Sequence, residues 1–168
     1  LWYYDDGTKR LEPVRYNPKS FVKAVLSADA LAGNDEQPIR FDSEDLDLNE
    51  EFGIVGTETS GVPPSITNLY GFIPKRDGIY EFFVQYHTNG AISSGNYGVH
   101  VYKTNEGDTY PDNKQIVASA DFAFPGGNAL NKVKRSVSTI IELKQGDIVD
   151  FYWSSTLGVS GGTLSSNN

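Results

Sequence analysis

The stretch from Phe72 to Asn89 constrains the fold more than any other part of the chain. It opens with turn residues, Pro74 and the pair Asp77-Gly78, and continues as a long run of aromatic, β-branched and polar residues without a helical period. Successive side chains of a strand point to opposite faces, so this run predicts one apolar face and one mixed face. The apolar face carries Tyr80, Phe82, Val84 and Tyr86, and the mixed face carries Glu81, Phe83, Gln85 and His87. The apolar face suits a core, and Phe83 on the mixed face predicts that a second surface covers it, such as another copy of the chain.

The rest of the chain has the composition of an all-β protein. Its 168 residues include 10 Tyr, 9 Phe, 17 Gly and 8 Pro, and no long segment shows the apolar period of a helix. Strand patterns separated by turn residues predict about eight or nine strands in an antiparallel β-sandwich of the jelly-roll type. The expected strands lie at residues 21–26, 38–41, 66–72, 78–89, 97–104, 116–124, 132–143 and 148–154.

Charge and residue content exclude several classes of function. The formal net charge is -8, which disfavours nucleic-acid binding because phosphate contacts need clustered Lys and Arg. The chain has no Cys, so disulfides and thiol chemistry do not contribute, and no apolar run is long enough to insert into a membrane. It also has no Met, from which we expect a processed product or a segment of a longer protein.

Residues 1–18 form a candidate appendage that precedes a main domain at residues 19–168. Aromatic residues at 2–4 and the apolar pair Leu11 and Val14 flank Asp6-Gly7, which is a turn signal. We therefore expect a short β-ribbon at the junction with a stalk, too small to fold alone.

The segment 42–51 is acidic and contains the spacing Asp45-x-Asp47-x-Asn49 of a calcium-binding loop. The pattern then fails, because Glu50 stands where such loops need Gly and no acid occupies the twelfth position. We interpret the segment as a solvated acidic loop and expect no cofactor, with calcium at Asp45, Asp47 and Asn49 as the alternative. The Gly-, Thr-, Ser- and Pro-rich residues 53–65 are also expected to be a loop.

Catalytic residues are not expected. His87 and His100 are the two side chains able to act as bases near neutral pH, and the chain has neither a Gly-x-Ser-x-Gly elbow nor a Cys nucleophile. We interpret both histidines as hydrogen-bonded strand residues.

Three motifs in order carry a resemblance to a known family. Phe21, Ala24 and Leu26 open the domain. Gly71-Phe72-Ile73-Pro74 is followed after three residues by Gly78-Ile79-Tyr80-x-Phe82, and Ile141-x-Leu143-x-x-Gly146-Asp147-x-Val149 comes near the end. This order resembles the globular head domain of the complement-q and tumour necrosis factor superfamily, over residues 20 to 154. The resemblance implies a ten-stranded jelly roll that assembles as a homotrimer on top of a stalk.

Two departures from that family are visible. Its heads end in an inner strand of the type Phe-Ser-Gly-aromatic-Leu, whereas this sequence closes on Ser166-Asn167-Asn168, so we expect the last strand to be missing or supplied from elsewhere. The second departure is the insertion from Asp42 to Ser65.

The resemblance also implies roles for individual residues. Residues expected at the trimer interface are Phe83, Gln85, His87, Ile148, Asp150 and Tyr152. Candidate receptor-contacting residues in loops are Asn96, Tyr97, Asn105 and Tyr110.

The function expected is that of a non-enzymatic trimeric head of a fibre-like structural protein, either a virion fibre of a phage or a surface adhesin. Its partners would be two further copies, an upstream stalk or virion protein, and a cell-surface glycan or protein, and its place would be extracellular or on the virion surface. Two alternatives stay open, namely a secreted pattern-recognition lectin or ligand of the same superfamily and a virion decoration protein that binds no receptor.

Overall fold

The structure is a computed structural model of the 168-residue chain, and it describes residues 2–5, 10–13, 20–26, 30–31, 36–60, 65–89, 95–124, 134–155 and 163–164. The described segments are strands joined by turns and short irregular stretches. In chain order the strands are β1 (Trp2–Asp5), β2 (Arg10–Pro13), β3 (Val22–Val25), β4 (Ala30–Leu31), β5 (Gln37–Pro38), β6 (Ser43–Asp47), β7 (Phe52–Ser60), β8 (Ser65–Phe72), β9 (Gly78–Asn89), β10 (Gly95–Thr104), β11 (Gln115–Phe124), β12 (Lys134–Leu143), β13 (Ile148–Ser155) and β14 (Thr163–Leu164).

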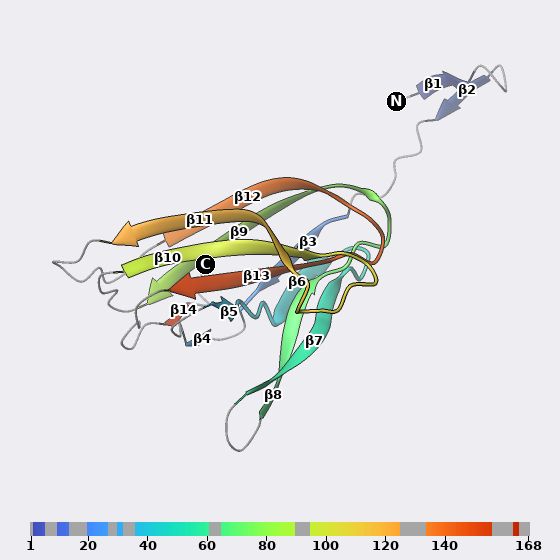
Figure 1. Cartoon of the computed structure of the whole chain (residues 1–168). Coiled ribbons are helices and arrows are strands. Elements are labelled where there is room, and N and C mark those ends of the chain that lie inside the picture. The colour runs from blue at the N-terminus through green and yellow to red at the C-terminus, as the bar shows by residue number, and fades with distance from the viewer. Residues whose placement is uncertain are drawn as a thin grey trace.

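Two antiparallel sheets face one another (Figure 1). The six-stranded sheet has the order β11-β10-β13-β8-β7, with β5 paired to β13. The four-stranded sheet has the order β12-β9-β14-β4. The expected all-β antiparallel sandwich is confirmed, and the strand order is compatible with a jelly roll.

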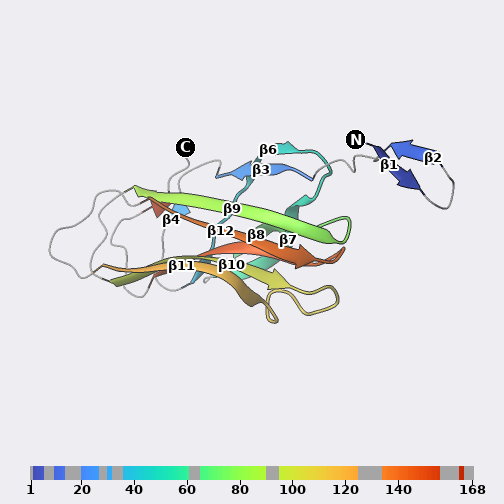
Figure 2. The ribbon, with the colours of Figure 1, turned by 90° about the horizontal axis from the view of Figure 1, so that it is seen from above.

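Two small ribbons accompany the sandwich. The strands β1 and β2 form the expected antiparallel hairpin, which Figure 1 shows apart from the two sheets. The strands β3 and β6 pair with one another and lie on the β9 side of the sandwich (Figure 2). The division of the chain at residue 18 stays a prediction.

The core between the sheets is built by the alternation that the sequence predicts. On β13, Val149, Phe151 and Trp153 point inward and are buried. On β9, Val84 and Tyr86 are buried, and the ring of Tyr86 meets that of Trp153 edge-on at a centroid distance of 4.7 Å. Such aromatic pairs add about 0.5–1.5 kcal/mol to the burial of their surface.

The tight turn between β12 and β13 is also as expected. Gly146 has a φ of 88°, a left-handed conformation that glycine adopts without a steric penalty. The buried carboxylate of Asp147 accepts the N–H groups of Lys144 at 2.9 Å and Glu106 at 3.0 Å, and it pairs with Nζ of Lys103 at 2.8 Å. Asp147 therefore ties this turn to the end of β10.

Two segments expected to be loops are strands instead. The acidic segment contains β6, which pairs with β3 and places Leu46 opposite Lys23. Residues 53–65 fall mostly within β7, which pairs with β8 over its whole length. The β-branched residues of β7 favour a strand more than its two glycines disfavour one. Gly56 leaves room for the ring of Tyr110, since a Cβ there would lie 2.7 Å from Cε1 of that ring.

One further expectation needs correction, and another stays open. The strand expected at 38–41 is the two-residue β5, after which the backbone N–H of Ile39 still donates to the carbonyl of Phe151 at 2.7 Å. The expectation that the family's last inner strand is missing or supplied from elsewhere stays a prediction, since beyond β13 the structure describes only the two-residue strand β14, which pairs with β9 and β4. Its two residues lie in a Ser-, Gly- and Thr-rich tail that gives almost no apolar signal.

Candidate functional site

The outer face of the β9–β12 pair exposes large apolar side chains. Ile79 is 78% exposed, Phe83 66% and Ile140 68%. Ile140 lies opposite Glu81 in the register, so Ile79 and Phe83 are its two diagonal neighbours on the same face. These three apolar side chains surround the exposed Glu81, and we call the group of Ile79, Phe83 and Ile140 the β9–β12 patch. Exposed large apolar side chains gathered on one face mark a candidate interaction site.

The chain itself covers part of the outer face of the other sheet. Nζ of Lys114 lies 3.3 Å from the ring centroid of Tyr152 and 4.4 Å from that of Tyr102. The hydroxyl of Tyr110 donates to Oδ2 of Asp150 at 2.8 Å. Asp150 and Tyr152 are consequently buried although they point away from the core.

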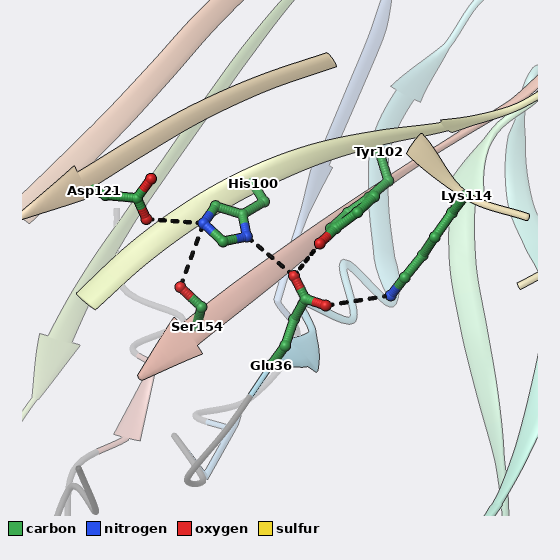
Figure 3. A network of polar contacts seen from close by, with 6 residues as sticks. All are labelled: Glu36, His100, Tyr102, Lys114, Asp121 and Ser154. Atoms are coloured by element: carbon green, nitrogen blue, oxygen red, sulfur yellow. Dashed lines mark hydrogen bonds and ion pairs between the residues drawn. The ribbon is translucent and has the colours of Figure 1, made fainter. Parts of the chain in front are cut away.

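A polar network centred on His100 continues this cover toward the start of β10 (Figure 3). Nε2 of His100 lies 2.8 Å from Oδ1 of Asp121 on β11, and Nδ1 lies 3.0 Å from Oε1 of Glu36. The same carboxylate of Glu36 accepts the hydroxyl of Tyr102 and lies 3.6 Å from Nζ of Lys114. Glu36 directly precedes β5, so the network fastens this segment to the sheet.

Gly98 makes room for the network. It lies opposite both Asp121 on β11 and Ser154 on β13. A Cβ at this position would overlap Oδ1 of Asp121 and would lie 2.8 Å from Oγ of Ser154 and 2.9 Å from Nε2 of His100. The carboxylate and the imidazole meet above this residue because it has no side chain.

The two carboxylates stabilise the charged form of His100. Partial burial lowers the pKa of His100, but the hydrogen bonds to Asp121 and Glu36 outweigh it and hold the pKa above its usual value. Burial likewise raises the pKa of Glu36, and the hydrogen bonds from Tyr102 and His100 more than reverse this, leaving that pKa below its usual value. The pair is thus favoured as imidazolium and carboxylate.

This arrangement suits a structural clamp better than general-base catalysis. Oγ of Ser154 lies 3.4 Å from Nε2 of His100, which superficially resembles a nucleophile beside its base. Both ring nitrogens face carboxylates, however, and an imidazolium that donates from both has no lone pair to accept the proton of Ser154. The expectation that His100 is a hydrogen-bonded strand residue is confirmed.

Asp150 forms a second polar centre on the same face. Burial raises the pKa of Asp150 to about 6, although the hydrogen bond from Tyr110 favours the carboxylate. Burial first and the nearby Asp150 second also raise the pKa of Tyr110. Both shifts have the same cause, since Asp150 is only 2% exposed on this part of the outer face.

The residues expected at a trimer interface fall on two different sheets. Phe83 is exposed and Gln85 is half-buried on the outer face of β9, whereas the side chain of His87 lies outside the described residues. Ile148 is half-buried on β13, and Asp150 and Tyr152 on the same strand are buried under their own chain. The structure therefore does not bring the two groups together within one subunit, and their shared interface stays a prediction.

The candidate receptor residues are also divided. Asn96 and Asn105 are exposed, and Nδ2 of Asn105 donates to Asp108 at 3.1 Å. Tyr97 is only 1% exposed, because it points into the core and stacks on Phe122 at a centroid distance of 5.4 Å. Tyr97 is therefore not a surface residue of this chain. Tyr110 is half-buried and bonded to Asp150, so its ring is committed to the fold.

The acidic residues singled out for calcium serve local structure. Asp45 pairs with Nζ of Lys23 at 2.7 Å, and Asp47 accepts the backbone N–H groups of Asn49 at 3.1 Å and Phe52 at 2.7 Å. Across the described residues, no group of three or more His, Cys, Asp and Glu side chains is placed to hold a metal ion. Within the same residues we find no helical segment with the length and hydropathy of a membrane span.

Several residues of these surfaces carried no signal in the sequence. Glu36 and Asp121 lie 64 and 21 positions from His100, and their proximity depends on strand register. Ile79 and Ile140 were readable in principle, since both occupy the polar phase of their strands, as Phe83 does.

A scan against protein-family models found no match for this chain, and a search of curated proteins found no relative.

Proposed function

We propose that this chain is a non-enzymatic β-sandwich head that assembles as a homotrimer through the β9–β12 patch. The observation that carries the proposal is the contrast between the two outer faces. Segments of the chain itself cover the six-stranded sheet at Tyr102 and Tyr152, whereas Ile79, Phe83 and Ile140 stand exposed on the other sheet.

The β3–β6 ribbon adds further exposed apolar side chains on the β9 side of the sandwich. Of the nine exposed large hydrophobic residues among those described, three form the β9–β12 patch and three more lie on or beside the β3–β6 ribbon. Those three are Phe21, Leu46 and Leu48. Burying one such side chain contributes about 1.5–3 kcal/mol, so an interface that covers most of these six would support a stable assembly.

A threefold assembly accommodates interface residues on different sheets. Rings of odd order use heterologous contacts, in which one patch of each subunit meets a different patch of the next. Phe83 and Gln85 of one copy can thus face the edge or outer surface of another copy near Ile148. The resemblance of the Gly71–Phe82 motif to trimeric heads of the complement-q and tumour necrosis factor superfamily favours three subunits over two.

We further propose that the head stands at the tip of a fibre on a virion or a bacterial surface and attaches it to a host. The β1–β2 hairpin apart from the sandwich supports a junction with an upstream stalk (Figure 1). The exposed Asn96 and Asn105 and the half-buried Tyr110 are the candidate receptor contacts that remain, since Tyr97 is buried. Three copies of a weak site would bind a surface with an avidity about 100-fold or more above that of one.

Two measurements test the proposal. Native mass spectrometry of the purified chain is expected to give a trimer, and a monomer at micromolar concentration would overturn the assembly. Labelled protein is then tested on a glycan array and on whole cells, where we expect binding by the trimer. A trimer that binds neither surface would favour the decoration alternative, and binding to soluble microbial glycans without cell attachment would favour the lectin alternative.

A further inference from the structure

Two tyrosine rings and a carboxylate form a cage on the outer face of the six-stranded sheet. Tyr102 lies on β10 and Tyr152 on β13, and their rings meet edge-on at a centroid distance of 5.0 Å and an angle of 75°. The carboxylate of Glu36 is fixed beside them, because it accepts the hydroxyl of Tyr102. The face of an aromatic ring is electron-rich, so a corner between two rings and a carboxylate attracts a cation.

Lys114 of the same chain occupies this cage. Its Nζ lies 3.3 Å from the ring centroid of Tyr152 and 4.4 Å from that of Tyr102. Figure 3 shows the same ammonium group beside Glu36, with 3.6 Å between Nζ and Oε2. That separation is longer than a hydrogen bond, so the ring faces and the charge of Glu36 hold the ammonium group there. Such a site does not depend on N–H donors and therefore also suits methylated and quaternary ammonium groups.

The side chain of Lys114 also separates the cage from solvent. Tyr102 and Tyr152 are buried, whereas 21% of the Lys114 side chain is exposed. Lys114 directly precedes β11, and its flexible four-carbon stem can turn away from the rings without movement of a strand. Rotation of this one side chain therefore opens the cage to a ligand from solution.

The surroundings of the cage are acidic. Asp150 is buried on the same face, where Oδ2 accepts the hydroxyl of Tyr110 at 2.8 Å and Oδ1 finds no hydrogen-bond partner among the described residues. Lys114 interacts electrostatically with the carboxyl groups of both Glu36 and Asp150. A cation that replaced Lys114 would meet the same two groups, whereas a negative charge carried beside that cation would be repelled.

We propose that the Tyr102–Tyr152 cage is a binding site for a methylated or quaternary ammonium group, and that Lys114 is an internal occupant which such a ligand displaces. The apparent affinity of the wild-type chain is then reduced by the fraction of molecules in which Lys114 has left the cage. The cage shares no residue with the β9–β12 patch, and a small cationic ligand goes beyond the proposed assembly. Because Tyr152 is also expected at a trimer interface, the assembly state is measured for each variant below.

The test compares choline binding by wild type and by Lys114→Ala in NMR titrations. Choline carries a trimethylammonium group, and dimethylbutanol, in which carbon replaces the charged nitrogen, is its neutral counterpart. We expect choline to bind Lys114→Ala about tenfold or more tightly than wild type, because the competing side chain is gone. We expect the neutral alcohol to bind that variant about tenfold or more weakly than choline does. Upfield shifts of the choline methyl protons and nuclear Overhauser effects to the rings of Tyr102 and Tyr152 locate the site.

Three further variants make the result specific. Lys144→Ala is the matched control, since Lys144 is exposed at the turn between β12 and β13, and choline should bind it as it binds wild type. Tyr152→Leu added to Lys114→Ala removes one ring face and should weaken choline binding about tenfold. Lys114→Gln repeats the measurement if the alanine variant does not fold, because it removes the charge but retains part of the stem. Native mass spectrometry of every variant keeps a change of assembly apart from a change of ligand binding.

Four outcomes would overturn the proposal. If choline binds neither Lys114→Ala nor Lys114→Gln, Lys114 only ties its own segment to the sheet. Equal affinity of choline for wild type and Lys114→Ala would show that Lys114 does not occupy the site. Equal binding of choline and the neutral alcohol would indicate an apolar hollow and not a cation site. Tighter binding of phosphocholine than of choline would contradict the acidic surroundings and indicate a site for the phosphate.

Discussion

Nε2 of His100 lies 2.8 Å from Oδ1 of Asp121, although the β10–β11 register places Gly98, not His100, directly opposite Asp121. The carboxylate leans over the bare glycine to reach the ring two residues further along the strand. The pair joins β10 to β11, and the second nitrogen of the ring joins β10 to Glu36.

The His100→Gln variant should lose stability in a pH-dependent manner. Because the pKa of folded His100 is raised, its contribution is fully present below the pKa of the unfolded chain and disappears as the pH rises through the folded pKa. In urea unfolding at about pH 5.5, 7 and 9, the gap between wild type and variant should therefore shrink as the pH rises. A gap that stays constant or widens would show that the charge of His100 does not stabilise the fold.

The Gly98→Ala variant should destabilise the sandwich by about 1–3 kcal/mol, since the added Cβ forces Asp121 and His100 apart. The matched control is Gly53→Ala on β7, where a Cβ would meet nothing within 4 Å. Urea midpoints measure both variants. Equal midpoints for the two variants would contradict the close approach at Gly98.

The Asp150→Asn variant should become more stable relative to wild type as the pH rises from about 4 to about 6.5. The pKa of folded Asp150 is raised to about 6 by burial, so between about pH 4 and pH 6 this carboxyl ionises in the unfolded chain but stays protonated in the fold, and wild type loses stability over that range. The expected change in the difference is about 2–4 kcal/mol, because each pKa unit corresponds to about 1.4 kcal/mol. Asp112→Asn, at an exposed position, should show no such trend.

On the proposed trimer, the Phe83→Asp variant should be monomeric or aggregated. A carboxylate in the β9–β12 patch would have to be buried without a partner, which should raise the dissociation constant by about 100-fold or more. Ile116→Asp is the control, because Ile116 is 55% exposed but lies on β11 of the other sheet. Native mass spectrometry of both variants measures the number of subunits. If only Ile116→Asp dissociates the assembly, the interface lies on the six-stranded sheet and not at the β9–β12 patch.

The sequence predicts the middle of this fold well because the core faces of its strands are apolar at alternate positions. β9 and β13 each carry aromatic residues or Val at every second position of the core face, and Asp77-Gly78 and Gly146-Asp147 mark where strands begin. The strands that the sequence does not predict are those that form because a neighbouring strand pairs with them. β6 is acidic and β7 is rich in Gly and Thr, yet β3 and β8 are aligned to pair with them.

The candidate sites show the same division. The sequence predicts part of the apolar patch, because Phe83 is a large apolar residue on the mixed face of its strand. The sequence does not predict the polar network around His100. Glu36, Asp121 and Lys114 come from separate segments, and they come together only through the strand register and the space left by Gly98. A pattern of residue types specifies which face a side chain occupies but not which residue on a distant strand it meets.

The position of β13 has a consequence for biosynthesis. It lies in the middle of the six-stranded sheet, and it follows in the chain every strand with which it pairs, namely β5, β8 and β10. A nascent chain that has emerged only as far as Leu143 therefore lacks the strand that joins β8 to β10, and both expose an edge to other nascent chains. Closing so many distant pairings at once is slow compared with forming local hairpins. We expect the yield of folded protein to depend on chaperones that shield those edges until Ile148–Ser155 arrives.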